Sequence, residues 1–146
     1  MEVLKPPHRK LSIFLGGSIE MGMAKDWQKM IESELSEEDI IIYNPRRDDW
    51  NSDWDQSIFN KEFKQQVVWE LDHLEKSDIV VMYFAENTKS PISLLEFGLY
   101  ASSGKLIVYC PDGFWRKGNV DIVCERYNIN QVRTEKELLI AIKSKI

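Results

Sequence analysis

One carboxylate lies in the middle of a stretch that otherwise has the composition of a buried core. Residues 90–105 read SPISLLEFGLYASSGK, and Glu96 is surrounded there by apolar and small residues. Ser93 and Glu96 have the S-x-x-E spacing of a capping box, in which the glutamate only completes the start of a helix. The same position suits catalysis, because a helix N-terminus favours the charged carboxylate and apolar neighbours remove its water. Glu96 is therefore either a capping residue or a nucleophile.

The segment GGSIEMG at residues 16–22 could bring backbone N–H groups close to a ligand. Gly16 and Gly17 have no side chain to keep a ligand away, and Ser18 and Ile19 follow them. Such segments bind ligands near the start of a helix. A tight structural turn uses the same residues, and the pattern is neither G-x-G-x-x-G nor a P-loop. Both interpretations stay open.

Residues 44–57, NPRRDDWNSDWDQS, form a long connection with two arginines and two tryptophans. Trp50 and Trp54 in so polar a loop offer flat apolar faces on which a nucleobase can stack. The opposite interpretation is that the rings fold back over the edge of a sheet. Arg46 and Arg47 can likewise contact a ligand or pair with the aspartates beside them.

The composition predicts one globular, cytoplasmic domain over residues 1–146. The chain has 43% apolar residues, enough for a full core, and its net charge of −5 gives no attraction to nucleic acid polymers or anionic membranes. The apolar run at residues 11–15 is too short for a signal peptide or a membrane span. Cys110 and Cys124 lack a CxxC spacing and a suitably placed histidine, so we expect reduced thiols and no metal site.

Short apolar runs alternate with segments of helical periodicity. The runs at residues 11–15, 40–43, 78–84 and 106–110 are unbroken, which is typical of strands buried on both faces, and a weaker run covers residues 129–132. Apolar residues recur at helical spacing in two further segments, which contain Trp27, Met30, Ile31 and Leu35, and Phe59, Phe63, Val67, Leu71 and Leu74.

This alternation predicts an α/β fold, a flavodoxin- or Rossmann-like three-layer sandwich with a mostly parallel five-stranded sheet. Thr134 followed by Glu137 has the spacing of a capping box and predicts a C-terminal helix. In such sheets the ligand binds at the carboxyl ends of the strands, here near the first and third strands.

The segments around these candidate residues resemble the nucleoside 2-deoxyribosyltransferase family, which includes deoxynucleoside 5′-monophosphate N-glycosidases. The resemblance covers residues 11–110: a strand followed by GGSI, a glutamate-bearing helix entering DIVVMYF, and then SPISLLEFGLYASSGK. Its most specific element is E-(F/L)-G-x-A-x-x-x-G-K. This chain matches it with Glu96, Phe97, Gly98, Ala101, Gly104 and Lys105, although the alanine lies three residues after the glycine rather than two.

The resemblance implies transfer of 2-deoxyribose between nucleobases, in which Glu96 attacks C1′ of a 2′-deoxynucleoside and no cofactor takes part. It places a second carboxylate eight residues before Asp78, at Glu70, with Asp72 as the alternative; a helix-surface glutamate is otherwise normally solvated. It also implies a homo-oligomer, a dimer or larger, with sites completed across subunits. The residues expected to contact substrate are Gly16, Gly17, Ser18, Ile19, Asn44, Arg46, Trp54, Asp72, Ser90 and Ser93.

Three positions depart from the family's pattern. Ser90 stands where a third acid is usual, Phe14 replaces a tyrosine that supports the nucleophile, and Glu20 replaces an arginine of the monophosphate hydrolases. Two alternatives to the transferase therefore remain. One is an N-glycosidase that releases the base to water, with Arg46, Arg47 and Lys105 available to replace the missing arginine. The other is a nucleotide-binding domain without catalysis.

Overall fold

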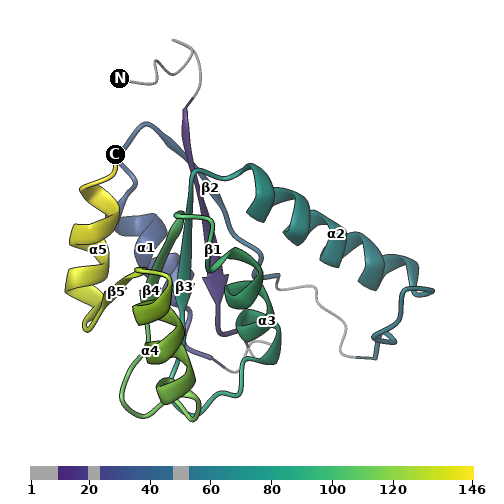
Figure 1. Ribbon diagram of the computed structural model, residues 1–146. Helices are drawn as coiled ribbons and strands as arrows, with labels where there is room; N and C mark the ends of the chain where they lie inside the picture. The colour runs from purple at the N-terminus through teal and green to yellow at the C-terminus, as the bar shows by residue number, and fades with distance from the viewer. Residues whose placement is uncertain (1–9, 20–23, 48–52) are drawn as a thin grey trace.

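A computed structural model describes residues 10–19, 24–47 and 53–146. Within them strands and helices alternate along the chain (Figure 1). Their bounds are β1 Leu11–Gly17, α1 Trp27–Glu34, β2 Ile40–Tyr43, α2 Lys61–Lys76, β3 Ile79–Tyr83, α3 Pro91–Tyr100, β4 Leu106–Tyr109, α4 Lys117–Arg126, β5 Asn130–Val132 and α5 Glu135–Lys143.

The strands form one parallel sheet in the order β2-β1-β3-β4-β5. Alternate strand residues face two separate cores. Ile13, Val81 and Ile107 pack with α1 and α5 on one face, whereas Phe14 and Val80 pack with α2, α3 and α4 on the other. The flavodoxin-like α/β fold expected from the sequence is confirmed.

The edge strand β2 is the exception to the expected burial on both faces. Its residues are only partly buried, and Ile41 is exposed. The prediction is wrong for this run because β2 has a neighbour on one side only and because α2, which follows it, projects away from the sheet (Figure 1). The runs that form β3 and β4 are buried as predicted, apart from the partly buried Tyr109 at the end of β4.

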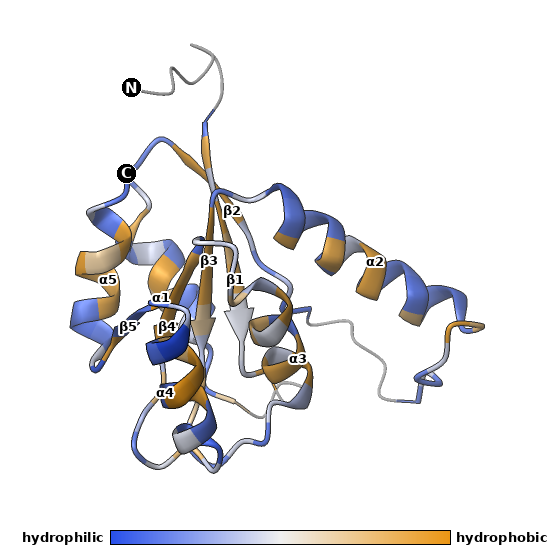
Figure 2. Cartoon of the chain, in the orientation of Figure 1, coloured by the Kyte–Doolittle hydropathy of each residue, from blue (hydrophilic) through white to orange (hydrophobic). Residues whose placement is uncertain are grey.

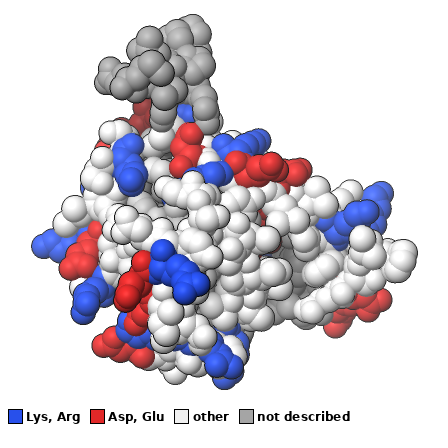
Figure 3. All heavy atoms as spheres, viewed as in Figure 1, with Lys and Arg blue, Asp and Glu red and all other residues white. Residues whose placement is uncertain are grey.

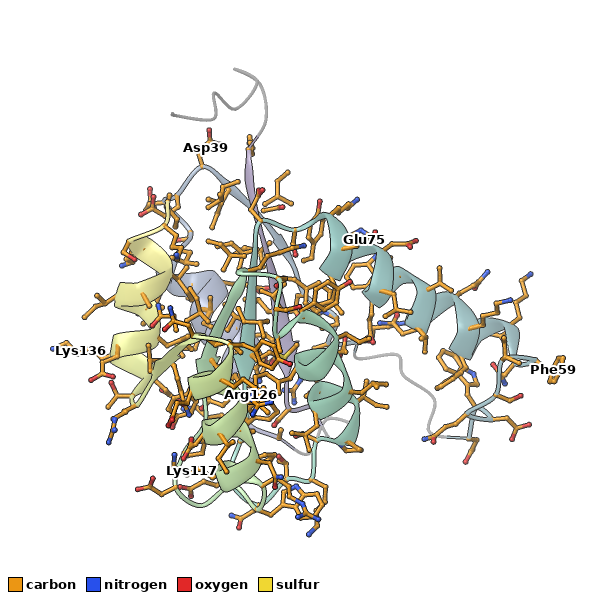
Figure 4. All side chains as sticks on the ribbon, viewed as in Figure 1. Asp39, Phe59, Glu75, Lys117, Arg126 and Lys136 are labelled. Atoms are coloured by element: carbon orange, nitrogen blue, oxygen red, sulfur yellow. The ribbon has the colours of Figure 1, made fainter. Side chains whose placement is uncertain are left out.

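The observed start of α5 agrees with the start predicted from the sequence, whereas the observed starts of α2 and α3 differ from the predicted ones. Thr134 caps α5 as predicted, since its side chain accepts a hydrogen bond from the Glu137 backbone N–H. Phe59 does not belong to the α2 stripe; it precedes the capping residue Asn60, is 95% exposed and points away from the body of the molecule (Figure 4). Ser93 caps no helix, because α3 already begins at Pro91.

Cys110, which follows β4, and Cys124, on the buried side of α4, are free thiols in the core, as predicted. Burial raises the pKa of Cys110 to about 12 and that of Cys124 to about 11. None of the helices in the described ranges is both long and apolar enough to cross a lipid bilayer.

Candidate active site

Glu96 lies in the second turn of α3 and is one of the buried residues of that helix. Only 7% of the residue is exposed, and its neighbour Phe97 packs edge-on against Phe84. Its Oε2 atom makes no hydrogen bond, a property shared in the described part of the chain only with Gln28 Nε2 among buried side-chain atoms. A buried polar atom without a partner is rare and costly, so it calls for an explanation.

The charge state of Glu96 differs from the sequence-based expectation. Burial, and then the nearby charge of Glu70, raise the pKa of Glu96 to about 8, so the carboxyl is mostly protonated at neutral pH. The sequence analysis expected an ionised carboxylate because it placed Glu96 in the first turn of the helix, where the helix dipole stabilises negative charge. Because α3 begins at Pro91, Glu96 lies one turn further in and desolvation dominates.

Glu70 of α2 lies near enough to Glu96 of α3 for its charge to act on the Glu96 carboxyl. Burial raises the pKa of Glu70, and a hydrogen bond from Gln66 Nε2 to Glu70 Oε1, 3.0 Å long, opposes that rise. The alternative acid Asp72 is exposed. It lies with Trp69 and His73 on a shallow hollow of about 400 Å³ along α2. Of the two acids, Glu70 is the one whose charge acts on Glu96.

Gly16 and Gly17 end strand β1 rather than forming a loop after it. A Cβ atom on Gly17 would lie 2.2 Å from the Tyr83 carbonyl oxygen, and Gly17 has a φ of +132°. A Cβ on Gly16 would lie 2.9 Å from Met82 Cε. Both glycines therefore allow β1 and β3 to pack closely, a structural role that differs from the tight turn considered above.

A cluster of three buried hydroxyl groups joins the ends of β1 and β3 to the start of α3. Ser18 Oγ lies 2.6 Å from Ser90 Oγ and 3.1 Å from Thr88 Oγ1, and it accepts a hydrogen bond from the Ala85 N–H at 2.8 Å. Ser90 has a φ of +48°. Its hydroxyl lies where the family resemblance expects an acid. No motif in the sequence singled out Thr88, because its role depends on a contact with a residue 70 positions away.

Ile19 and Ser93 are two further residues that the sequence analysis expected to contact substrate. Ile19 is partly buried and its carbonyl accepts a hydrogen bond from the Ala24 N–H. Ser93 is buried within α3, three residues before Glu96. Phe14, where a supporting tyrosine is usual, is fully buried and its ring centroid lies 6.2 Å from that of Trp69.

The segment that follows β2 connects α1 and α2. Asn44 Nδ2 donates to Glu32 Oε1 at 2.8 Å, and Arg46 donates to the Ala24 carbonyl at 2.7 Å and to the Lys25 carbonyl at 3.2 Å. The Arg46 contacts hold the segment against the residues that precede α1, and the Asn44 contact reaches the C-terminal part of that helix. The neighbouring arginine, Arg47, instead reaches α2.

Arg47 contacts Gln66 of α2 and the ring of Trp54. Its Nη1 donates to Gln66 Oε1 at 3.1 Å, and its guanidinium carbon lies 5.5 Å from the ring centroid of the partly buried Trp54. Glu20 and Trp50, which the sequence also singled out, lie outside the described residues.

Lys105 lies at the amino end of strand β4. It precedes β4, and its Nζ donates to the carbonyl oxygens of Leu74 and Glu75 at 3.0 and 2.7 Å, at the C-terminal end of α2. Lys105 therefore stabilises the end of a helix, and its part in the glycosidase alternative stays a prediction.

A family model described as "Nucleoside 2-deoxyribosyltransferase like" matches residues 10–114, which is more than half of the chain and includes α2, α3 and both acids. The chain belongs to the nucleoside 2-deoxyribosyltransferase-like family. No curated relative matches it. A crystal structure of a conserved protein from Enterococcus faecalis V583 is similar, with a TM-score of 0.64 and 14% identity over 94% of this chain and 100% of that one. At this level of sequence identity, the likeness shows that the two proteins share a fold and does not bear on the chemistry.

Two of the hollows on the described surface of this nucleoside 2-deoxyribosyltransferase-like chain bear on where a ligand could bind. The larger, about 530 Å³, lies on the other face of the sheet beside α1 and includes Lys25, Tyr83 and Tyr109. Neither hollow includes Glu96 or Glu70. No group of three or more His, Cys, Asp or Glu residues suited to a metal ion occurs in the described ranges. In general, carboxyl groups such as those of Glu96 and Glu70 are able to act as nucleophiles and to transfer protons.

Proposed function

We propose that the chain is a nucleoside 2-deoxyribosyltransferase, which transfers 2-deoxyribose between nucleobases through a covalent glycosyl–Glu96 intermediate. The observation that supports this most is the buried Glu96 carboxyl, with an unbonded Oε2 and with the charge of Glu70 nearby. A carboxyl held dehydrated beside a second one costs stability, and a role in bond formation explains why the fold contains it.

The protonated state of Glu96 supplies the proton that the reaction needs. As the C1′–N bond breaks and the C1′–O bond to Glu96 forms, the proton of Glu96 passes to Glu70 and from there to the departing base nitrogen. The base leaves neutral, and Glu70 ends the half-reaction as it began. An acceptor base reverses these steps, so no separate acid is required.

The outer side of α3 is suited to contact with a second copy of the chain. Ile92, Leu95 and Leu99 are exposed along the outer side of the helix that carries Glu96 on its inner side. Figure 2 shows apolar residues around much of α3, and Figure 3 shows few charged side chains over it. A helix that is apolar all round is normally buried. We therefore include a homo-oligomer that packs through α3 in the proposal.

The test is incubation of the protein with deoxyinosine and free adenine. We expect new deoxyadenosine, and a protein mass increased by one deoxyribosyl group when acceptor is withheld. Glu96→Gln should abolish both, whereas Glu75→Gln, which removes an exposed carboxylate of α2, should retain them. Free deoxyribose that accumulates despite abundant adenine would identify a glycosidase. Nucleoside-dependent thermal stabilisation without turnover would identify a binding domain.

A further inference from the structure

Gln66 is a buried polar residue of α2 that contributes both ends of its amide to the surroundings of Glu70. It is 8% exposed and lies one helical turn before Glu70, so the two side chains occupy the same side of the helix. Gln66 Nε2 donates to Glu70 Oε1 at 3.0 Å and also faces the Pro45 carbonyl at 3.5 Å. Gln66 Oε1 accepts from Arg47 at 3.1 Å.

Arg47 determines which end of this amide faces Glu70. A guanidinium group has only donors, so the Gln66 atom opposite it must be the carbonyl oxygen. The amide nitrogen is then directed at the Glu70 carboxyl. If the amide turned over, two donors would meet at Arg47 and two acceptors at Glu70, and both contacts would be lost.

The neutral amide between Arg47 and Glu70 also suits a group that must accept a proton. A guanidinium bonded directly to a carboxylate strongly stabilises the charged form. A hydrogen bond from a single amide N–H also fixes the carboxyl in place, but it stabilises the charged form less than a guanidinium does. Glu70 consequently keeps a pKa above its ordinary value, because burial outweighs the hydrogen bond from Gln66.

We propose that Gln66 and Arg47 form a positioning pair that holds Glu70 in one orientation toward Glu96 and links the acids to the segment following β2. Neither residue touches the reacting atoms; both act through Glu70, and the role rests on the proposed function. Arg46, the residue directly before Arg47, fixes the same segment to the carbonyl groups of Ala24 and Lys25, which precede α1. Arg47, which also lies against Trp54, therefore connects the placement of this segment to the orientation of an acid on a different helix.

The first test measures deoxyinosine–adenine exchange in Gln66→Met, which keeps the size of the side chain and removes its hydrogen bonds. We expect kcat to fall roughly 10- to 100-fold, as for a displaced catalytic group, with KM changed less than about threefold. Gln65→Met makes the same chemical change at the neighbouring, exposed position and should leave kcat unchanged. Arg47→Met should act like Gln66→Met, and Arg47→Lys, which keeps a donor, should recover part of the loss.

The second test does not depend on turnover. Carbon-13 NMR of glutamate side-chain carboxyls follows the titration of Glu70, assigned by its loss in Glu70→Gln. Gln66→Met and Arg47→Met should raise the titration midpoint of Glu70 and Gln65→Met should not. Unchanged titration in both variants, or loss of kcat equal in Gln65→Met, would overturn the positioning role. If the wild type has no exchange activity but the midpoints shift as expected, the proposed function fails and the positioning pair stands.

Discussion

At the scale of single residues, burial of Glu96 makes the stability of the fold depend on pH. The unfolded chain releases the Glu96 proton near pH 4.5, whereas the folded chain keeps it up to about pH 8. Between these values the folded state binds more protons than the unfolded state, so the free energy of unfolding decreases as pH rises from about 4.5 to about 8. Burial raises the pKa of Glu70 as well and adds to the same trend.

Glu96→Gln removes the larger of these contributions and keeps the shape of the side chain. We expect this variant to unfold at a higher temperature than the wild type at pH 8, by a free energy of at most a few kcal/mol, and to match it near pH 4.5. Thermal unfolding followed by circular dichroism between pH 4.5 and 8.5 measures the difference. Parallel curves for the two proteins would show that Glu96 is not protonated in the fold.

Residue-level chemistry was only partly predictable from the sequence. The surroundings of Glu96 indicated burial, and the family pattern pointed to Glu70, but neither could give the charge state. That state depends on how far Glu96 lies from the start of α3 and on a carboxylate 26 residues away in the chain. Gln66 was missed although a signal existed, since a glutamine four residues before a glutamate can hydrogen bond to it on a helix.

At the scale of elements, the start of α5 is a local feature that can be tested by itself. Thr134→Ala removes the hydroxyl that accepts from the Glu137 N–H. We expect the free energy of unfolding to fall by about 1 kcal/mol, the usual cost of losing a helix cap. Urea titration measures the loss, and Ser102→Ala, at an exposed position after α3, is the matched control. Equal effects of both substitutions would mean that the cap contributes nothing.

The start of α3 shows why one cap was predictable and the other was not. Thr134 precedes a helical apolar pattern and has no competitor nearby. Ser93 has the same spacing to its glutamate, but Pro91 two residues earlier is well suited to the first position of a helix, and α3 begins there. The left-handed backbone of Ser90 and its hydroxyl contacts with Ser18 fix that start. Those contacts are long-range and cannot be read from local spacing.

At the scale of the whole molecule, the sheet order followed from the sequence because unbroken apolar runs separated by helices leave few arrangements of a parallel sheet. Edge positions did not follow, since a run such as IIIY has the same composition whether it is central or at the edge. The apolar outer side of α3 also appears only when the helices are placed on the sheet (Figure 2).

That outer side gives a prediction about assembly. Light scattering should give twice or a higher multiple of the 17.1 kDa chain mass, because a paired α3 removes its exposed apolar residues from water. Leu95→Lys, at a residue that is 60% exposed, should reduce the mass toward that of one chain. Ile122→Lys, at a 69% exposed position on α4, should not. A wild-type protein of single-chain mass at high concentration would contradict the proposed oligomer.

The two thiols buried in the core at α4 have a practical consequence. Alkylating reagents attack the thiolate, and burial both covers Cys110 and Cys124 and keeps them protonated at physiological pH. Iodoacetamide can therefore modify them only while α4 is lifted from the sheet or the chain is unfolded. The rate of carbamidomethylation of the native protein, followed by mass spectrometry, therefore measures how often the region around α4 opens.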